Sequence, residues 1–254
     1  MEEHLIVCAG LQKRYGRQTA LQNVDLQVGR GRIIGLLGPN GSGKTTLIKL
    51  LCGLIQPSEG ELRIDGQKPG PYTKSIVSYL PDRMYFSDWM TPRDILDLFE
   101  DFYKDFRRDR AEAMCAALKI DLGKRIKAMS KGTKEKMQLI LVMSREAQLY
   151  LLDEPIAGVD PAARDFILET ILRNYNEQGT VLISTHLIAD VEKVLDEVIF
   201  ICNGQIVRHE SVDQIRETEG KTVDALFREI FRAMPYPQMP VWDGFPRMEG
   251  GAQE

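Results

Sequence analysis

Apolar and polar residues alternate along the first part of the chain, and this pattern predicts short β-strands. The alternation covers residues 4–37 in three segments with turn residues between them: "HLIVCAGLQKRYG", "TALQNVDLQVGRG" and "RIIGLLG". Two later segments, "GELRIDG" and "IVSYL", predict further strands. Between them, "TTLIKLLCGL" has apolar residues at helical spacing and ends at "QPSEG".

The pattern changes to a helical one between Thr91 and Ala147. Thr91 is a suitable N-cap, Pro92 suits the first helical position, and Asp94 completes an arrangement like a capping box. An apolar stripe with a period of 3.6 residues runs through "ILDLFEDFYKDF", "AEAMCAALKI" and "EKMQLILVMSREA". We therefore expect a helical subdomain over residues 82–148.

Strands and helices alternate again after this insertion. The continuous apolar runs "LYLLD" and "TVLIST" are typical of buried parallel strands, and helical patterns follow in "AARDFILETILRNY" and "LIADVEKVL". The segment "EVIFICNGQIVRHE" predicts a hairpin with Asn203-Gly204 in its turn. The predicted fold class is α/β, with a core formed by residues 1–81 and 149–232. Four prolines and three glycines in residues 233–254 argue against a packed element there.

Composition excludes several classes of protein. The formal net charge of −4 gives no support for binding nucleic acid. The four cysteines lie far apart, which argues against a zinc site or a disulfide framework and favours a reducing compartment. No apolar run approaches the ~18 residues of a membrane span, and the acidic start "MEEH" does not resemble a signal peptide. We expect a cytoplasmic protein, unless a partner holds it at a membrane.

A glycine-rich segment carries the strongest chemical signal. "GPNGSGKT" matches G-x-x-x-x-G-K-[ST] in full, and it lies between a predicted strand and a predicted helix. Backbone N–H groups of such a loop surround phosphates, and the helix N-terminus adds its dipole. We expect Lys44 to reach the β- and γ-phosphates of ATP and Thr45 to bind Mg²⁺. The predicted phosphate-binding residues are Gly38, Pro39, Asn40, Gly41, Ser42, Gly43, Lys44, Thr45 and Thr46.

Two carboxylates lie where the predicted strand "LYLLD" ends: Asp153 is its last residue, and Glu154 follows it. Asp153 is expected to hold Mg²⁺ through water, and Glu154 points differently, so it is expected to act as general base toward the attacking water. Carboxylates often follow strands, so the pair alone is a weak signal. Together with the phosphate loop it predicts a P-loop NTPase (RecA-like) core with an antiparallel β subdomain and the helical insertion subdomain.

At this point the chain resembles an ABC ATPase, the nucleotide-binding subunit of an ABC transporter, over about residues 4–215. "MSKGTKEK" lies where that family has its LSGGQ signature, and "AGVDP" resembles the D-loop, with Asp160 in the aspartate position. "STH" puts His186 at the position of the switch histidine, the expected γ-phosphate sensor. Tyr15 resembles the aromatic residue that stacks on adenine.

The resemblance also accounts for an unusual helix start. Cations are unfavourable in the first turn of a helix, yet Lys131, Lys134 and Lys136 crowd this one. In the resembled family two subunits dimerise head to tail, and the signature of one faces the γ-phosphate bound to the other. Ser130, Lys131, Gly132 and Asp160 would therefore contact ATP in the partner. For Lys134 and Lys136 we expect a solvated helix face.

Two departures from the family pattern bear on function. Lys131 replaces the first glycine of the signature, a variant that resembles cassettes paired with ABC-2-type membrane subunits, many of which are exporters. Asp82 stands where the family usually has glutamine, so its role toward ATP and Mg²⁺ is open: it would bind the metal directly, through water, or not at all.

The resemblance implies two partners, a second nucleotide-binding subunit and a separate transmembrane permease. We expect the permease to dock near Met84–Met90, because this hinge segment carries Met84, Tyr85, Phe86, Trp89 and Met90. The expected location is then the cytoplasmic face of the membrane, peripherally bound. The cargo, the direction of transport and the composition of the dimer are not determined.

Two alternatives fit the sequence less well. A soluble ABC ATPase acting on ribosomes or DNA would usually have long coiled coils or two cassettes, and this chain has one cassette and a net negative charge. A P-loop kinase or GTPase would not need the "SKG", "AGVD" and "STH" segments together, and no N-K-x-D sequence is present.

Overall fold

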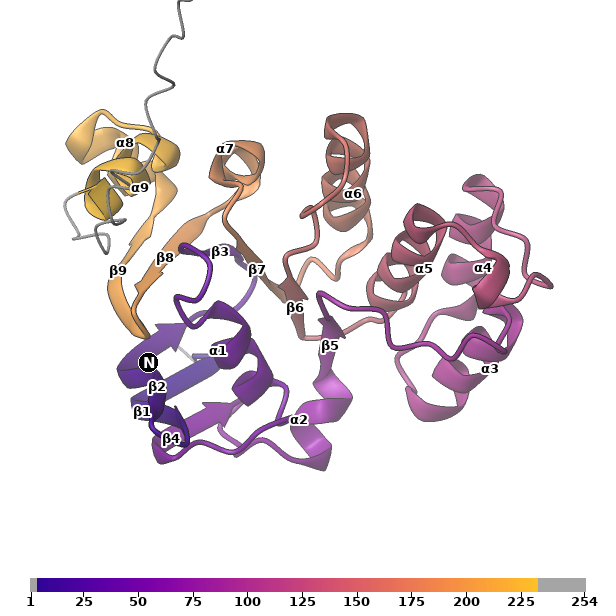
Figure 1. Ribbon diagram of the computed structural model, residues 1–254, viewed down its shortest axis with the longest axis horizontal. Coiled ribbons are helices and arrows are strands. Elements are labelled where there is room, and N and C mark those ends of the chain that lie inside the picture. Colours follow the sequence, from indigo (N-terminus) through magenta and orange to yellow (C-terminus); the bar gives the residue numbers. More distant parts are fainter. Residues whose placement is uncertain (1–3, 233–254) are drawn as a thin grey trace, which may run out of the picture.

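A six-stranded sheet forms the centre of the computed structural model, which describes residues 4–232 (Figure 1). Its strand order is β5-β6-β7-β3-β8-β9, and all strands except β9 pair in parallel. The strands are β3 (Ile33–Leu37), β5 (Val77–Leu80), β6 (Leu149–Asp153), β7 (Thr180–Thr185), β8 (Glu197–Cys202) and β9 (Gln205–Ser211). The strands β3, β6 and β7 are buried along their whole length, as their continuous apolar runs predict.

A second, antiparallel sheet covers one face of this central sheet. It has the order β2-β1-β4, formed by β1 (Ile6–Tyr15), β2 (Gln18–Val28) and β4 (Glu59–Ile64). The apolar side chains of α1 (Lys44–Leu51) share one hydrophobic cluster with this sheet and with alternate residues of the central strands. The predicted antiparallel subdomain is confirmed.

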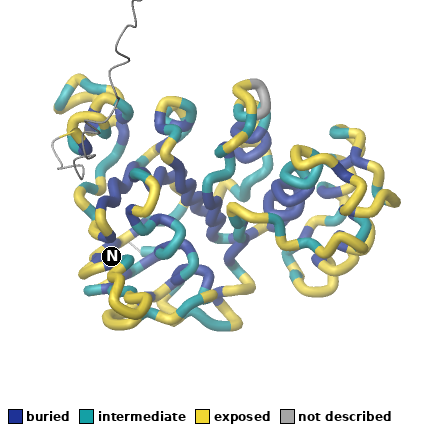
Figure 2. Tube along the Cα trace, in the orientation of Figure 1, coloured by how far each residue is buried: buried dark blue, intermediate teal, exposed yellow. Residues whose placement is uncertain are grey.

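Four helices belong to the opposite face of the central sheet. They are α6 (Pro161–Asn174), α7 (Ile188–Val191), α8 (Val212–Glu219) and α9 (Val223–Arg232). Their apolar residues join the other set of alternate strand residues, such as Ile33 and Leu37, in a separate cluster. Figure 2 shows the resulting buried centre of the core.

The helical subdomain lies to one side of the core and has its own hydrophobic cluster (Figures 1 and 2). It contains α3 (Pro92–Phe102), α4 (Arg108–Ala117), a 3₁₀ turn (Ile126–Ala128) and α5 (Lys131–Met143). Thr91 caps α3: its Oγ1 accepts from the N–H of Asp94, and the Asp94 carboxylate accepts from the N–H of Thr91. This cluster contains buried residues from Ile95 to Leu141, whereas Val142 and Met143 at the end of α5 belong to a cluster of the core. The boundaries 82–148 stay a prediction.

Several elements differ from the sequence predictions. Helix α2 (Pro71–Ile76) and the C-terminal helices α8 and α9 were not predicted. The segment "LIADVEKVL" forms one short helix, α7, followed by a 3₁₀ turn at Glu192–Val194. Helix α5 ends at Met143, so residues 144–147 form a link to β6 instead of a last helical turn. The tail prediction, residues 233–254, lies outside the described residues.

The remaining predictions on the described residues concern turns, cysteines and membrane spans. Asn203 and Gly204 both have positive φ angles, 47° and 77°, as a tight hairpin turn requires. All four cysteines are buried and free. Within residues 4–232, no helix combines the length and the apolar character needed to cross a bilayer.

Candidate functional site: a nucleotide-binding cavity

The glycine-rich loop joins β3 to α1 and forms the floor of the candidate site. Gly43 has a φ of 112°, and a Cβ atom there would lie 2.8 Å from the carbonyl oxygen of Ala20. A Cβ on Gly38 would overlap the carbonyl oxygen of Ile201. Only glycine fits at these two positions, so the loop backbone stays close to its neighbours and leaves room above it.

Lys44 begins α1 and its ammonium group lies against the loop. Its Nζ donates to the carbonyl oxygens of Gly38 (2.8 Å) and Pro39 (3.2 Å), and it lies 3.4 Å from Oε1 of Glu154. The side chain is nearly buried. A cation held at the loop in this way is positioned for an anionic ligand.

Asp153 occupies a buried corner beside the start of α1. Its Oδ1 accepts hydrogen bonds from Ser184 Oγ (2.6 Å) and Thr45 Oγ1 (3.2 Å), whereas its buried Oδ2 has no hydrogen-bond partner. Burial raises the pKa of Asp153; the two hydroxyl groups oppose this shift, and the negative charges of Asp82 and Glu154 add to it. A cation at this corner would satisfy the unpaired oxygen, so the residues fit Mg²⁺.

Glu154 turns away from the strand that carries Asp153. Its φ is 51°, and its backbone N–H bonds to Ser184 at both the carbonyl oxygen (3.0 Å) and Oγ (3.1 Å). This turn brings Oε2 of Glu154 to within 3.0 Å of Nδ1 of His186. The structure thus places the predicted base and the predicted sensor in contact, close to Lys44.

Lys44, Thr45 and Glu154 line a cavity of about 590 Å³, whereas Asp153 and His186 lie behind this lining. Tyr15 lies at its exposed edge, with Nζ of Lys13 5.2 Å from the ring centroid. Asp82 also lines the cavity, and its carboxylate is half-exposed and 3.9 Å from Arg83. Neither Ser184 nor the walls formed by the β1–β2 and β8–β9 turns were predicted from the sequence. The cavity is lined by Tyr15, Gln18, Thr19, Ala20, Asn40, Gly41, Ser42, Gly43, Lys44, Thr45, Thr46, Asp82, Glu154, Asn203 and Gly204.

The residues predicted to act on a partner's ATP line a different cavity. Ser130, Lys131, Gly132 and Asp160 border a space of about 340 Å³ that shares no lining residue with the nucleotide cavity. Ser130 caps α5, its Oγ accepting from the N–H of Thr133 at 3.2 Å. The signature and the D-loop of one chain therefore lie side by side.

The lysines of the signature differ in their surroundings. Lys131 is exposed and lies 3.6 Å from Glu135. Lys134 and Lys136 are only partly exposed: Nζ of Lys134 lies 3.9 Å from Asp88, and Nζ of Lys136 lies 5.5 Å from the ring centroid of Phe166. The expectation of a solvated face for these two lysines was therefore wrong, because both side chains rest on neighbouring elements.

The residues of the predicted docking segment, Met84–Met90, have different surroundings in the structure. Phe86 and Met90 pack against the core of the helical subdomain, and Trp89 is exposed. Met84 and Tyr85 line a groove of about 780 Å³ between the core and α3. Its apolar walls carry four of the exposed large hydrophobic residues in the described chain: Leu54, Tyr85, Leu98 and Phe102.

Comparison with known proteins places this site in a family. The model of the family described as ABC transporter matches residues 21–157, which include the phosphate loop, Asp153 and Glu154. The chain belongs to the ABC transporter family. This family's cassettes hydrolyse ATP, and the matched segment of this chain includes the glycine-rich loop that lines the cavity described above.

Similarity extends to relatives and to solved structures. An uncharacterized ABC transporter ATP-binding protein of Synechocystis is 34% identical over 77% of this chain, which spans 58% of that relative's length. The SkfA peptide export ATP-binding protein SkfE of Bacillus subtilis is 31% identical over 84% of this chain and 92% of its own length. A solved ATP-binding subunit of an ABC transporter is 29% identical with a TM-score of 0.79, covering 89% of this chain and 99% of that chain.

Proposed function

We propose that this chain is the ATP-hydrolysing subunit of an exporter, working as a dimer beneath a separate membrane subunit. The catalytic part of this proposal rests on the contact of Glu154 with His186, at the edge of the cavity that Lys44 lines. A carboxylate so placed can take a proton from water next to a phosphate bound by the loop.

The other residues of the cavity have distinct roles in this proposal. Lys44 and the loop N–H groups bind the phosphates, Tyr15 stacks on the base, and His186 contacts the terminal phosphate and keeps Glu154 oriented. Mg²⁺, when bound, supplies positive charge against the phosphate oxygens. Thr45 and Asp153 would hold it, with Asp82 near enough to contribute through the same cavity.

A second copy completes the site in this proposal. Ser130, Lys131, Gly132 and Asp160 line a cavity separate from the chain's own nucleotide cavity, so they are available to another chain. The N-terminus of α5 would place its N–H groups and Lys131 against the partner's γ-phosphate, which explains why this helix tolerates a cation in its first turn.

The groove between the core and α3 is the proposed contact with the membrane subunit. An apolar groove of this size with exposed aromatic residues is typical of sites that receive an amphipathic helix. The export direction is supported by the similarity to SkfE and by the "SKG" signature. The peripheral location at the cytoplasmic face follows from this docking.

The groove can be tested with two matched charge insertions. Phe102 is 73% exposed in the groove wall, and Leu172 is 38% exposed on α6, outside the groove. Phe102→Glu should remove the chain from membranes isolated with it, whereas Leu172→Glu should leave it bound; both should keep ATP binding. Equal membrane retention of the two variants would contradict the docking role.

A further inference from the structure

A buried arginine lies at the junction of the helical subdomain and the core. Arg145 follows Ser144, the C-cap of α5, and is 2% exposed. Its Nε and Nη2 donate to the two oxygens of Asp105, each at 3.0 Å. Its Nη1 donates to the carbonyl oxygen of Val77 (2.5 Å) and its Nη2 also to that of Ser75 (2.6 Å). The guanidinium carbon lies 3.8 Å from the ring centroid of Tyr103.

These contacts join three parts of the molecule through one rigid group. Asp105 and Tyr103 follow α3, which forms a wall of the groove, and Ser75 and Val77 lie where α2 passes into β5. The guanidinium is planar, and its bidentate pair with Asp105 fixes its orientation. The angle between α5 and β5 is therefore set by hydrogen bonds with defined directions.

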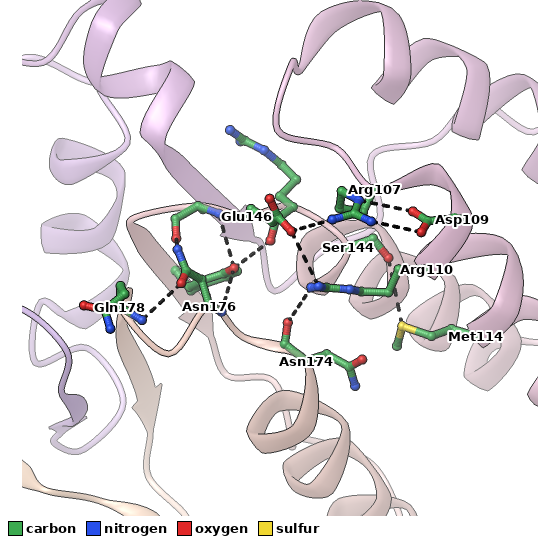
Figure 3. Close-up of polar contacts among 12 residues, drawn as sticks. Arg107, Asp109, Arg110, Met114, Ser144, Glu146, Asn174, Asn176 and Gln178 are labelled. Atoms are coloured by element: carbon green, nitrogen blue, oxygen red, sulfur yellow. Dashed lines mark hydrogen bonds and ion pairs between the residues drawn. The ribbon is translucent and has the colours of Figure 1, made fainter.

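Neighbouring contacts support the same junction from its exposed side (Figure 3). The N–H of Arg107 donates to the carbonyl oxygen of Ser144 (2.8 Å), and Arg107 pairs with Glu146 (2.9 Å). Arg110 donates to the carbonyl oxygen of Asn174 at the end of α6 (3.1 Å). Exposed ion pairs of this kind contribute little to stability, so the buried group dominates the geometry.

Stability alone does not account for a charge at this position. Replacing a buried ion pair by apolar residues of similar volume is often neutral or stabilising. Here Arg145 is buried and the Asp105 side chain is 24% exposed, so we explain the charge by the geometry that its hydrogen bonds define. That geometry concerns α5, because Arg145 lies two residues beyond its last residue and Ser130 caps its start.

The length of α5 makes its direction critical. Its 13 residues span about 20 Å at a rise of ~1.5 Å per residue, so a tilt of ~5° at Arg145 would move Ser130 by about 2 Å. A misplacement of ~1 Å at a reacting site can cost ~10²-fold in rate. A phosphate contact made by Ser130 therefore depends on the group that sets the helix direction.

We infer that Arg145, paired with Asp105, is a positioning residue for the half-site that this chain offers to its partner's ATP. This inference rests on the proposed dimer. None of the hydrogen-bond partners of Arg145 lines the chain's own nucleotide cavity, so its pairing affects the assembly of two chains and leaves the binding of ATP by one chain intact.

The test uses Asp105→Asn in a Glu154→Gln background, in which ATP-bound dimers accumulate. Asparagine keeps the shape of the side chain and removes its charge. We expect the concentration needed for ATP-driven dimerisation to rise by about tenfold or more. The affinity of the dilute chain for mant-ATP should change by less than about twofold, as expected for distant sites.

Two further variants make the comparison specific. Glu112→Gln removes a carboxylate from an exposed pair with Arg108 inside α4 (2.9 Å) and should leave dimerisation unchanged. Arg145→Lys keeps the charge but loses the planar fork, and should weaken dimerisation as Asp105→Asn does. The inference is overturned if Asp105→Asn dimerises like Glu112→Gln, or if it weakens mant-ATP binding by the same factor as dimerisation.

A direct measurement separates this inference from the proposed function. Spin labels on cysteines introduced at Lys127 and Lys68, both exposed, report the distance between the helical subdomain and the core in a single chain. Asp105→Asn should broaden this distance distribution without nucleotide, and an unchanged width would refute the inference. Failure of the parent Glu154→Gln chain to dimerise would instead refute the proposed dimer.

Discussion

Replacing Glu154 by glutamine is expected to stop hydrolysis while preserving the site. The amide oxygen can accept from Nζ of Lys44, which lies 3.4 Å from Oε1, and the amide nitrogen can donate to Nδ1 of His186, 3.0 Å from Oε2. Both contacts survive with a change of histidine tautomer only, so the variant removes proton acceptance and little else.

The expected loss follows from that single change. A positioned general base contributes ~10²–10⁴-fold, so the rate of ATP hydrolysis should fall by at least about two orders of magnitude. At ~1.36 kcal/mol per factor of ten, this corresponds to an increase of about 3 kcal/mol or more in the activation free energy. Binding of ATP should be retained, since a carboxylate beside the phosphates is replaced by a neutral group.

Phosphate release at saturating ATP measures the rate, and light scattering measures the mass of the ATP-bound species. Glu146→Gln is a matched control, because this exposed carboxylate pairs with Arg107 away from the cavity. The control should hydrolyse ATP at the wild-type rate, and Glu154→Gln should accumulate as a dimer. A wild-type rate for Glu154→Gln would refute its assignment as the base.

Three further outcomes are expected. Asp82→Ala should raise the Mg²⁺ concentration for half-maximal ATPase activity severalfold, and an unchanged titration would place Asp82 outside the metal's surroundings. Lys131→Glu should weaken ATP-driven dimerisation more than ATP binding by the monomer. The loss in dimerisation free energy should be on the order of a few kcal/mol, because a negative charge would lie near the phosphate. Equal dimerisation of variant and wild type would show that Lys131 is a solvated side chain without contact to the phosphate. Burial raises the pKa of Asp153 above its unfolded value, so its ionised form destabilises the fold above the folded pKa. This cost decreases as the pH falls below the folded pKa and is absent below the unfolded pKa. Asp153→Asn should therefore raise Tm without nucleotide, by ~2–4 °C per kcal/mol, while abolishing Mg²⁺-dependent hydrolysis; a lower Tm would contradict the destabilising burial.

The sequence predicted the parts of the site that depend on local chemistry. The phosphate loop is one continuous segment whose glycines and lysine all serve to bind phosphates, so it can be recognised without knowledge of the fold. Asp153 and Glu154 lie at the end of a strongly apolar strand, which marks their position in the same way. Ser184 was missed because its bond to Asp153 joins residues 31 positions apart. Arg145 was missed for the same reason: its partners Asp105 and Val77 lie 40 and 68 positions away.

The missed helices had signals of different strength. In α9, apolar residues recur at Val223, Leu226, Phe227 and Ile230, which is the spacing of an amphipathic helix and was detectable. Helix α2 has only six residues, and its start is closed by a bond from the N–H of Gly70 to Thr73. Such a short element is defined by its tertiary surroundings more than by its pattern.

In the proposed dimer, each chain contributes two half-sites with no lining residue in common, one for binding ATP and one for closing over the ATP of another chain. Defects in the two halves should consequently complement each other. In a mixed dimer of a chain damaged at Lys44 and a chain damaged at Ser130, both lesions fall into one composite site and the other site is intact. Mixing two inactive preparations should then restore activity, in proportion to the fraction of mixed dimers.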